Sequence, residues 1–180
     1  MTPYLFKSKR LGFRNWKSND LEILTQINSD EDVMEFFSFK PTKEDSKAFI
    51  IRMQNMYIEK GFCYFAVDLL GTGELIGFIG LAEQTYLDDM GVFIDIGWRL
   101  KKSIWNKGYA TEGAIACLNF GFNNIGLKKI YSTAPQINKK SELIMKKIGM
   151  QQTKTFEHPR LLDNERLKKC VLYKILTPRD

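Results

Sequence analysis

The stretch from Gly91 to Phe122 constrains the fold most, because it joins an alternating segment, a short loop and a helical pattern without a break. The alternation over 91–100 predicts a β-strand, and the apolar stripe after Gly108 predicts a helix. A glycine inside the strand, Gly97, indicates a bulge or a close approach by another group. One face of the strand carries Val92, Ile94, Ile96, Trp98 and Leu100, and the other carries Phe93, Asp95, Gly97 and Arg99.

The loop before this helix has the features of an anion site. The first backbone N–H groups of a helix have no internal acceptor, and the helix dipole is positive there. Gly108 lets a phosphate approach the backbone, and Lys107 adds a positive charge. The same features also suit an ordinary turn into a surface helix. The loop matches neither GxxxxGK[ST] nor GxGxxG, so a nucleoside-triphosphate or dinucleotide site is not favoured.

The rest of the chain predicts further strands and helices around a mixed sheet, which defines an α/β (α+β) fold class. Gly71-Thr72-Gly73 is a hairpin signal between two strand-like runs. The expected strands are 9–16, 62–69, 75–82, 91–100, 129–134 and 167–176. Helices are expected after Asn19-Asp20, Pro41-Thr42 and Gly108, and over 138–147.

The composition favours one domain, because 180 residues with 44% hydrophobic side chains can bury a core. No apolar run is long enough for a bilayer and the N-terminus lacks a signal-type core, so we expect a cytoplasmic protein without a membrane partner. The single histidine, His158, excludes a multi-His metal site, and no metal is expected. The three widely spaced cysteines, Cys63, Cys117 and Cys170, are expected to be reduced and buried.

Two blocks of the sequence resemble the GNAT superfamily of acyl-CoA-dependent N-acyltransferases. They read IGWRLKKSIWNKGYATEGAIACLNFGF and APQINKKSELIMKKIGM. Within the superfamily they are similar to the branch typified by ribosomal-protein N-terminal (alanine/serine) acetyltransferases. The resemblance covers about residues 9–176. It implies a single N-acetyltransferase domain over 1–180, with a strongly twisted mixed sheet, flanking helices and a cleft between the strands 91–100 and 129–134.

The resemblance also implies acetyl-CoA as co-substrate. The pantetheine arm would lie beside the end of the strand 91–100, and the pyrophosphate would lie on the loop 102–110. The branch usually has Trp-Gly-Lys-Gly-Tyr-Ala in this loop, whereas this chain has Asn106 at the first glycine. Asparagine tolerates a left-handed backbone better than most residues, so we expect the loop to be kept. The implied cofactor-binding residues are Ile96, Gly97, Trp98, Leu100, Trp105, Asn106, Lys107, Gly108, Tyr109, Ala110, Asn138 and Ser141.

The helix 138–147 matches the family's Asn-x-x-Ser. Asn138 would cap this helix and touch the pantetheine, although an N-cap alone also explains an asparagine there. Ser141 would lie near the thioester sulfur, in a position that also suits an ordinary first-turn serine. Many family members carry a tyrosine general acid further along this helix, where this chain has Met145. Since methionine cannot donate a proton, Ser141 or a water is the expected substitute.

Acetyl transfer to an amine needs a proton acceptor, because an α-amine titrates near 8 and a lysine amine near 10.4. Asp95 is the first candidate, since it lies on the less apolar face of the strand that leads to the cofactor. Glu83, at the end of the preceding strand, is the second. A solvent-facing or paired acid is the alternative interpretation of both. Backbone N–H groups near 96–98 are candidates to hold the thioester carbonyl.

The acceptor amine stays open from the sequence. A protein N-terminus, ribosomal or other, an amino acid, a polyamine and an aminoglycoside all remain. The alternatives to an enzyme are a non-catalytic acyl-CoA sensor and a ribosome-associated binding protein. The net charge of +6 is scattered over separate lysine pairs, so direct nucleic-acid binding is not expected. A monomer and a homodimer fit equally well.

Overall fold

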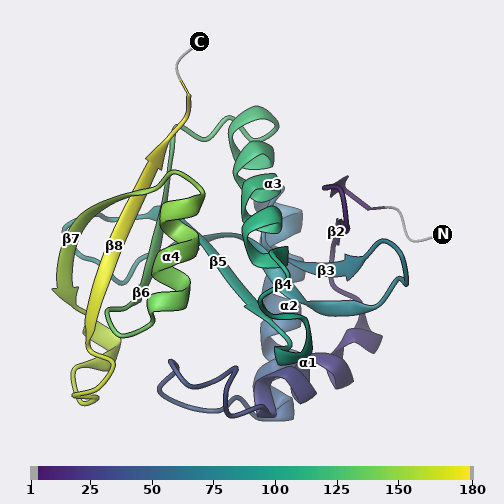
Figure 1. Cartoon of the computed structure of the whole chain (residues 1–180), viewed down its shortest axis with the longest axis horizontal. Coiled ribbons are helices and arrows are strands. Elements are labelled where there is room, and N and C mark those ends of the chain that lie inside the picture. The colour runs from purple at the N-terminus through teal and green to yellow at the C-terminus, as the bar shows by residue number, and fades with distance from the viewer. Residues whose placement is uncertain (1–3, 179–180) are drawn as a thin grey trace.

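The protein folds around one eight-stranded sheet in the order β1-β2-β3-β4-β5-β6-β8-β7, seen in a computed structural model that describes residues 4–178 (Figure 1). All neighbouring strands are antiparallel except β5 and β6. The strands are β1 (Phe6–Lys7), β2 (Leu11–Arg14), β3 (Tyr64–Leu69), β4 (Leu75–Gln84), β5 (Phe93–Leu100), β6 (Lys129–Pro135), β7 (Gln151–Glu157) and β8 (Lys169–Leu176). The helices are α1 (Leu21–Ser29), α2 (Lys43–Lys60), α3 (Tyr109–Asn123) and α4 (Lys139–Lys147), with short 3₁₀ turns at Ser18–Asp20, Lys102–Ile104 and Pro159–Leu161.

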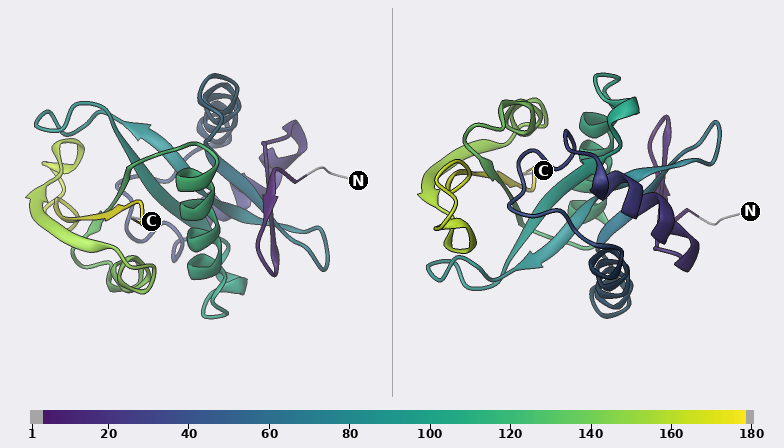
Figure 2. Two further views of the ribbon diagram at one scale, coloured as in Figure 1. Left: turned by 90° about the horizontal axis from the view of Figure 1, so that it is seen from above. Right: turned by 90° about the horizontal axis from the view of Figure 1, so that it is seen from below.

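The helices cover both faces of the sheet. Figure 2 shows α3 and α4 on one side of the strongly twisted sheet and α1 and α2 on the other. On the α3 face, Phe6 stacks on Phe120 with ring centroids 4.4 Å apart. On the α2 face, the Phe49 ring lies 5.1 Å from that of Phe78. Because both faces are covered, side chains that point either way from the central strands become buried.

The strands β5 and β6 part after a single pair of residues. β5 pairs with β4 over eight consecutive positions, from Gly77↔Leu100 to Gln84↔Phe93. Toward β6 it pairs only at Asp95↔Tyr131. The predicted opening between these two strands is therefore confirmed, and the second half of β5 has one edge without a ladder partner.

The predicted elements are mostly present, with differences at the sheet edges. β1 and β7 were not predicted, and the first predicted strand is shorter than 9–16. β7 carries the polar sequence QQTKTFE and lies at the end of the sheet order, so its side chains show little apolar alternation. Val92, which was predicted to lie within the strand 91–100, instead precedes β5 and is 65% exposed.

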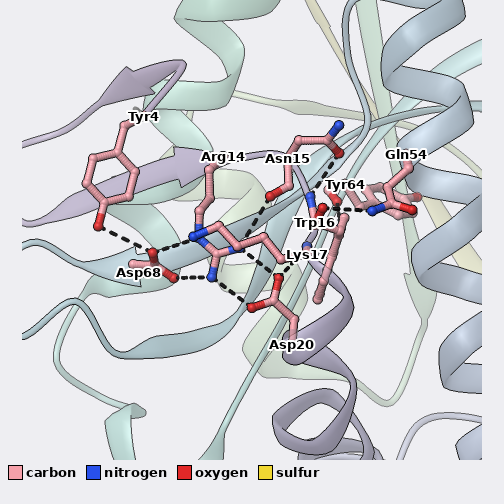
Figure 3. A network of polar contacts seen from close by, with 9 residues as sticks. All are labelled: Tyr4, Arg14, Asn15, Trp16, Lys17, Asp20, Gln54, Tyr64 and Asp68. Atoms are coloured by element: carbon pink, nitrogen blue, oxygen red, sulfur yellow. Dashed lines mark hydrogen bonds and ion pairs between the residues drawn. The ribbon is translucent and has the colours of Figure 1, made fainter. Parts of the chain in front are cut away.

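A buried arginine fixes the start of α1 to the sheet. Arg14 makes two hydrogen bonds to Asp68, from Nε at 2.7 Å and from Nη2 at 2.8 Å. It makes two more to Asp20, from Nη1 at 2.7 Å and from Nη2 at 2.9 Å (Figure 3). The hydroxyl of Tyr4 donates to Asp68 at 3.3 Å. This network joins β2, β3 and the turn before α1, and its guanidinium is paired with two carboxylates.

Candidate active site

The loop between β5 and α3 presents unpaired backbone N–H groups. Asn106 has φ 61° and Gly108 has φ 81°, so both adopt the left-handed conformation that turns the chain sharply into the helix. The backbone N–H groups of residues 106–111 have no hydrogen-bond acceptor within residues 4–178. The left-handed backbone expected of Asn106 is thus present. The N-terminus of α3 offers several donors together with the positive end of its dipole.

Trp105 holds this loop against the rest of the protein. Its indole Nε1 donates to the carbonyl of Leu100 at 2.8 Å, which closes the loop back on the end of β5. Its ring packs against the small apolar cluster formed by Ile27, Val33 and Met34. The ammonium of Lys140 lies 4.9 Å from the centre of the same ring. The loop therefore contacts both α4 and the segment after α1.

Arg10 lies beside the loop, a position that the sequence did not reveal. Its guanidinium stacks over the ring of Tyr109 at 4.2 Å, and a Cβ added to Gly108 would lie 3.5 Å from its Nη2. Its Nε donates to Glu112 at 2.6 Å, and Glu112 also accepts from the hydroxyl of Ser8. Lys107 adds a second cation, with its Nζ donating to the carbonyl of Ser103 at 3.2 Å. The donors of α3 are thus flanked by two positive side chains.

The ring of Tyr64 lies over Gly97, in the middle of β5. A Cβ added to Gly97 would lie 3.1–3.3 Å from atoms of this ring. The register with β4 runs through Gly97 without a shift, so the close approach anticipated from the sequence is present and a bulge is not. On the β6 side, the carbonyl of Ile96 accepts a hydrogen bond from the hydroxyl of Ser132 at 3.0 Å. Beyond that contact, Trp98 is half-buried and Leu100 is buried.

Asp95 is buried at the point where β5 and β6 part. The hydroxyl of Tyr64 donates to its Oδ1 at 2.5 Å, and Nε2 of Gln84 donates to the same oxygen at 3.3 Å. The side chain has no cationic partner among the described residues. Burial raises the pKa of Asp95 to about 6, although the bonds from Tyr64 and Gln84 oppose the rise.

Glu83 lies apart from Asp95. It pairs with Ile94 in the β4–β5 ladder, whereas Asp95 pairs with Ala82, so the two carboxylates point to opposite faces of the sheet. Glu83 forms an ion pair with Lys60 at 3.1 Å, and both side chains are partly exposed. The structure therefore does not bring the two predicted acids together.

The start of α4 lies next to β6, in the other half of the sheet. Asn138 is its N-cap, and its Oδ1 accepts from the backbone N–H of Ser141 at 3.1 Å. Ser141 is half-buried in the first turn, and Met145 is buried with 1% exposed. The Tyr173 hydroxyl donates to Glu142 at 3.0 Å. Two predicted residues, Asn138 and Ser141, thus lie at one helix start, and Met145 belongs to the core.

Arg99 is a half-buried cation that the sequence did not single out. It lies on the same face of β5 as Asp95, four residues further along the strand. Its Nη1 donates to Oδ1 of Asn28 at 2.7 Å, and its guanidinium stacks over Phe37 at 4.1 Å. The alternation of β5 contained this signal, since Asp95 and Arg99 flank Gly97 on one face.

Other candidate groups take structural positions. His158 caps the turn Pro159–Leu161, accepting from the backbone of Arg160 at 3.2 Å, and stacks on Tyr86. The three cysteines are free and buried, as expected. Two surface hollows, of about 480 Å³ on α2 and 360 Å³ beside β1 and α3, lie away from Asp95, and their shallow linings carry no constellation of catalytic groups. Within residues 4–178, no group of His, Cys, Asp and Glu is arranged to hold a metal ion, and no helix is long and apolar enough to cross a membrane.

A sheet that opens between two parallel strands, next to a helix whose N-terminus is lined by free donors, defines the class of acyl-CoA-dependent N-acyltransferases. Comparison with known proteins agrees with this assignment. The chain belongs to the GNAT acetyltransferases, because the family model "Acetyltransferase (GNAT) domain" matches residues 10–151. It is therefore an N-acetyltransferase by family, and enzymes of this family use acetyl-CoA.

Individual relatives support the same family. The chain is 34% identical over 155 residues to the "Uncharacterized N-acetyltransferase YnaD" of Bacillus subtilis, covering 83% of this chain and 84% of that protein. A GNAT-family acetyltransferase structure from Bacillus anthracis superposes with a TM-score of 0.77 at 29% identity, over 95% of this chain and 97% of the other. A ribosomal-protein-S5-alanine acetyltransferase from Vibrio fischeri shares the fold with a TM-score of 0.72 at 15% identity, over 96% of each chain.

Proposed function

We propose that this enzyme transfers the acetyl group of acetyl-CoA directly to a primary amine, with Asp95 as the proton acceptor. The observation that carries the proposal is a buried carboxylate without a cationic partner at the position where β5 and β6 separate. A buried acid with a raised pKa in such a place is typical of a catalytic group. The whole chain would act as one catalytic domain.

The cofactor would lie along the open edge of β5. The N–H groups of residues 106–111 and the cations of Arg10 and Lys107 suit a pyrophosphate. The open backbone edge of 97–100 suits the amides of the pantetheine arm, and Asn138 would meet the same arm from α4. Ser141, one turn into α4, would lie beside the departing sulfur and supply it with a proton directly or through water.

The raised pKa of Asp95 makes it a better proton acceptor. Proton transfer from an α-ammonium near pKa 8 to an ordinary aspartate near 3.9 is uphill by about four units, or about 5.5 kcal/mol. With Asp95 titrating at about 6, the gap falls to about two units. Oδ1 already accepts from Tyr64 and Gln84, so Oδ2 is the oxygen that would receive the proton. The neutral amine then attacks the thioester carbonyl, the C–S bond breaks, and the nitrogen's extra proton passes to the departing thiolate through Ser141 or water.

The proposal is tested by thiol release from acetyl-CoA with a panel of amines: peptide N-termini, amino acids, polyamines and aminoglycosides. We expect release with one class, and acetyl-CoA alone should raise the melting temperature because it binds the folded state. No release with any class, together with no thermal shift at millimolar acetyl-CoA, would overturn the proposal.

A matched pair of variants tests the cofactor loop. Gly108→Glu places a carboxylate in the expected phosphate site and should abolish the thermal shift by acetyl-CoA. Gly126→Glu is the control, because Gly126 has a nearly equal φ of 79° against 81° and open space around its Cα, but lies at the far end of α3. Both variants carry the same left-handed strain, of about 1–2 kcal/mol. Equal loss of binding in both would mean that the loop is misassigned.

A further inference from the structure

Arg99 carries a half-buried positive charge that no described carboxylate neutralises. Within residues 4–178 it forms no ion pair, and its only side-chain hydrogen bond is the one to Asn28. Its Nε is fully buried and has no acceptor, and it is the one described buried side-chain nitrogen or oxygen in that state. The guanidinium lies between Phe37 at 4.1 Å and Phe78 at 5.4 Å. Burial lowers the pKa of Arg99 to about 10, which still leaves it charged at neutral pH.

The surroundings of Arg99 hold it in a fixed place. Asn28 is 2% exposed and donates from its Nδ2 to the hydroxyl of Ser46 at 2.9 Å. Ser46 in turn donates to the carbonyl of Thr42 at 2.9 Å. A partly desolvated guanidinium without a counter-ion is costly, because the lost hydration is not offset by an attractive partner. A site that keeps this charge oriented and unpaired is suited to an anion that arrives from outside.

The position of Arg99 relates it to the reaction centre. Arg99 and Asp95 project from the same face of β5 with Gly97 between them, and the ring of Tyr64 covers that glycine. Four residues of strand span about 13 Å, and both side chains can lean into that interval. A molecule with an amine at Asp95 and an anion at Arg99 would lie along β5, past Tyr64. Phe37, which is 42% exposed, covers the guanidinium from the segment between α1 and α2.

We propose that Arg99 binds a carboxylate of the amine acceptor, so that the enzyme acetylates amines that carry a carboxylate several bonds away. The proposal rests on the proposed acetyl transfer. Nη2 has no acceptor within the described residues, and Nε lies on the same side of the guanidinium, so the two can hold a carboxylate in a bidentate pair once the Phe37 ring moves. Polyamines, which carry no anion, would leave the charge unpaired.

Matched acceptors test the proposal through kinetics. The acids are glycine, β-alanine, 4-aminobutyrate and 6-aminohexanoate, and each is compared with its own amide. We expect kcat/KM for the best acid to exceed that for its amide by about tenfold or more, since hydrogen bonds to charged groups are the strong ones. In Arg99→Gln this preference should fall to about one through a higher KM for the acid. An equal or better amide in the wild type, or a preference that survives in Arg99→Gln, would overturn the proposal.

A binding measurement separates this proposal from the proposed chemistry, because it needs no turnover. The Nε–H of Arg99 is buried and should therefore give a slowly exchanging signal in protein labelled with ¹⁵N-arginine, assigned by its loss in Arg99→Lys. Titration with 6-aminohexanoate in the presence of CoA should shift this signal, and titration with 6-aminohexanamide should not. A shift without thiol release would refute the chemistry alone. No shift with any of the four acids would refute the carboxylate site alone.

Discussion

Two arginines on the same face of one sheet have opposite surroundings, and Arg14 is buried whereas Arg99 is half-buried. Arg14 of β2 makes four hydrogen bonds to the carboxylates of Asp20 and Asp68, and the pKa of Arg14 is raised above its usual range. Arg99 of β5 has one hydrogen bond, to a neutral amide, and the pKa of Arg99 falls to about 10. Arg14 bonds to Asp20, directly before α1, and Arg99 bonds to Asn28 within α1.

The contrast indicates two roles for a charged side chain. Arg14 stabilises the fold, whereas Arg99 is available to a ligand. The Arg14 network satisfies its own members, so it fastens β2, β3 and the start of α1 without needing anything from outside. Asp95 and Arg99 lie on one strand, yet neither forms an ion pair with the other or with another described residue. Local charge that is left uncompensated is the physical mark of the candidate site.

The largest expected effect is on stability, from Arg14→Met. This change leaves Asp20 and Asp68 buried without their partner and should lower the free energy of unfolding by about 3–5 kcal/mol, measured by urea denaturation. Combining it with Asp20→Asn and Asp68→Asn should restore part of the loss, because no unpaired charge remains. If Arg14→Met lowers the free energy of unfolding by less than about 1 kcal/mol, the proposed difference between Arg14 and Arg99 is wrong.

Asp95→Asn should lower the activity of the enzyme but raise its stability. We expect acetyl transfer to fall by about 100-fold or more, since the proton acceptor is lost. The folded-state pKa of about 6 lies above the unfolded value near 3.9, so the stability tied to protonated Asp95 is present below pH 3.9 and is lost as pH rises through 6. At pH 7.5 the variant should therefore be more stable than the wild type, by up to about 3 kcal/mol. A lower melting temperature with full activity would assign Asp95 a structural role instead.

Arg99→Met should change stability little. It removes one hydrogen bond and one unpaired, half-buried charge, and these effects oppose each other, so the free energy of unfolding should stay within about 1 kcal/mol of the wild type. Urea denaturation of this variant beside Arg14→Met sharpens the comparison, since the two substitutions are chemically identical. A loss as large as that of Arg14→Met would show that Arg99 holds the fold.

The smallest expected effect is at the cofactor loop. Asn106→Gly relieves a left-handed asparagine, with φ 61°, and should raise stability by a few tenths of a kcal/mol while acetyl-CoA still binds. Asn124→Gly is the control, because Asn124 has φ −101° and gains no relief. Differential scanning calorimetry of the two variants checks the sign, and an equal shift in both would contradict the account of the loop.

The sequence predicted what depends on local pattern. The alternation over 91–100, the left-handed Asn106 and the cap at Asn138 each need only a few neighbouring residues, and the structure contains them. It did not predict β7, because an edge strand with polar side chains has no apolar signature. The sequence also did not predict that Tyr64 is the hydrogen-bond partner of Asp95. The two residues are 31 positions apart in the chain, and only the pairing of β3, β4 and β5 brings them together.

The pH dependence of acetyl transfer tests the central claim most directly. With the best amine from the panel, kcat/KM of the wild type should bend near pH 6, where Asp95 gains its proton, and fall more steeply below that value. In Asp95→Asn the bend of kcat/KM near pH 6 should be absent. Any pH dependence that comes from protonation of the amine should remain. A bend that persists in Asp95→Asn would contradict the claim that the unpaired carboxylate of β5 is the proton acceptor.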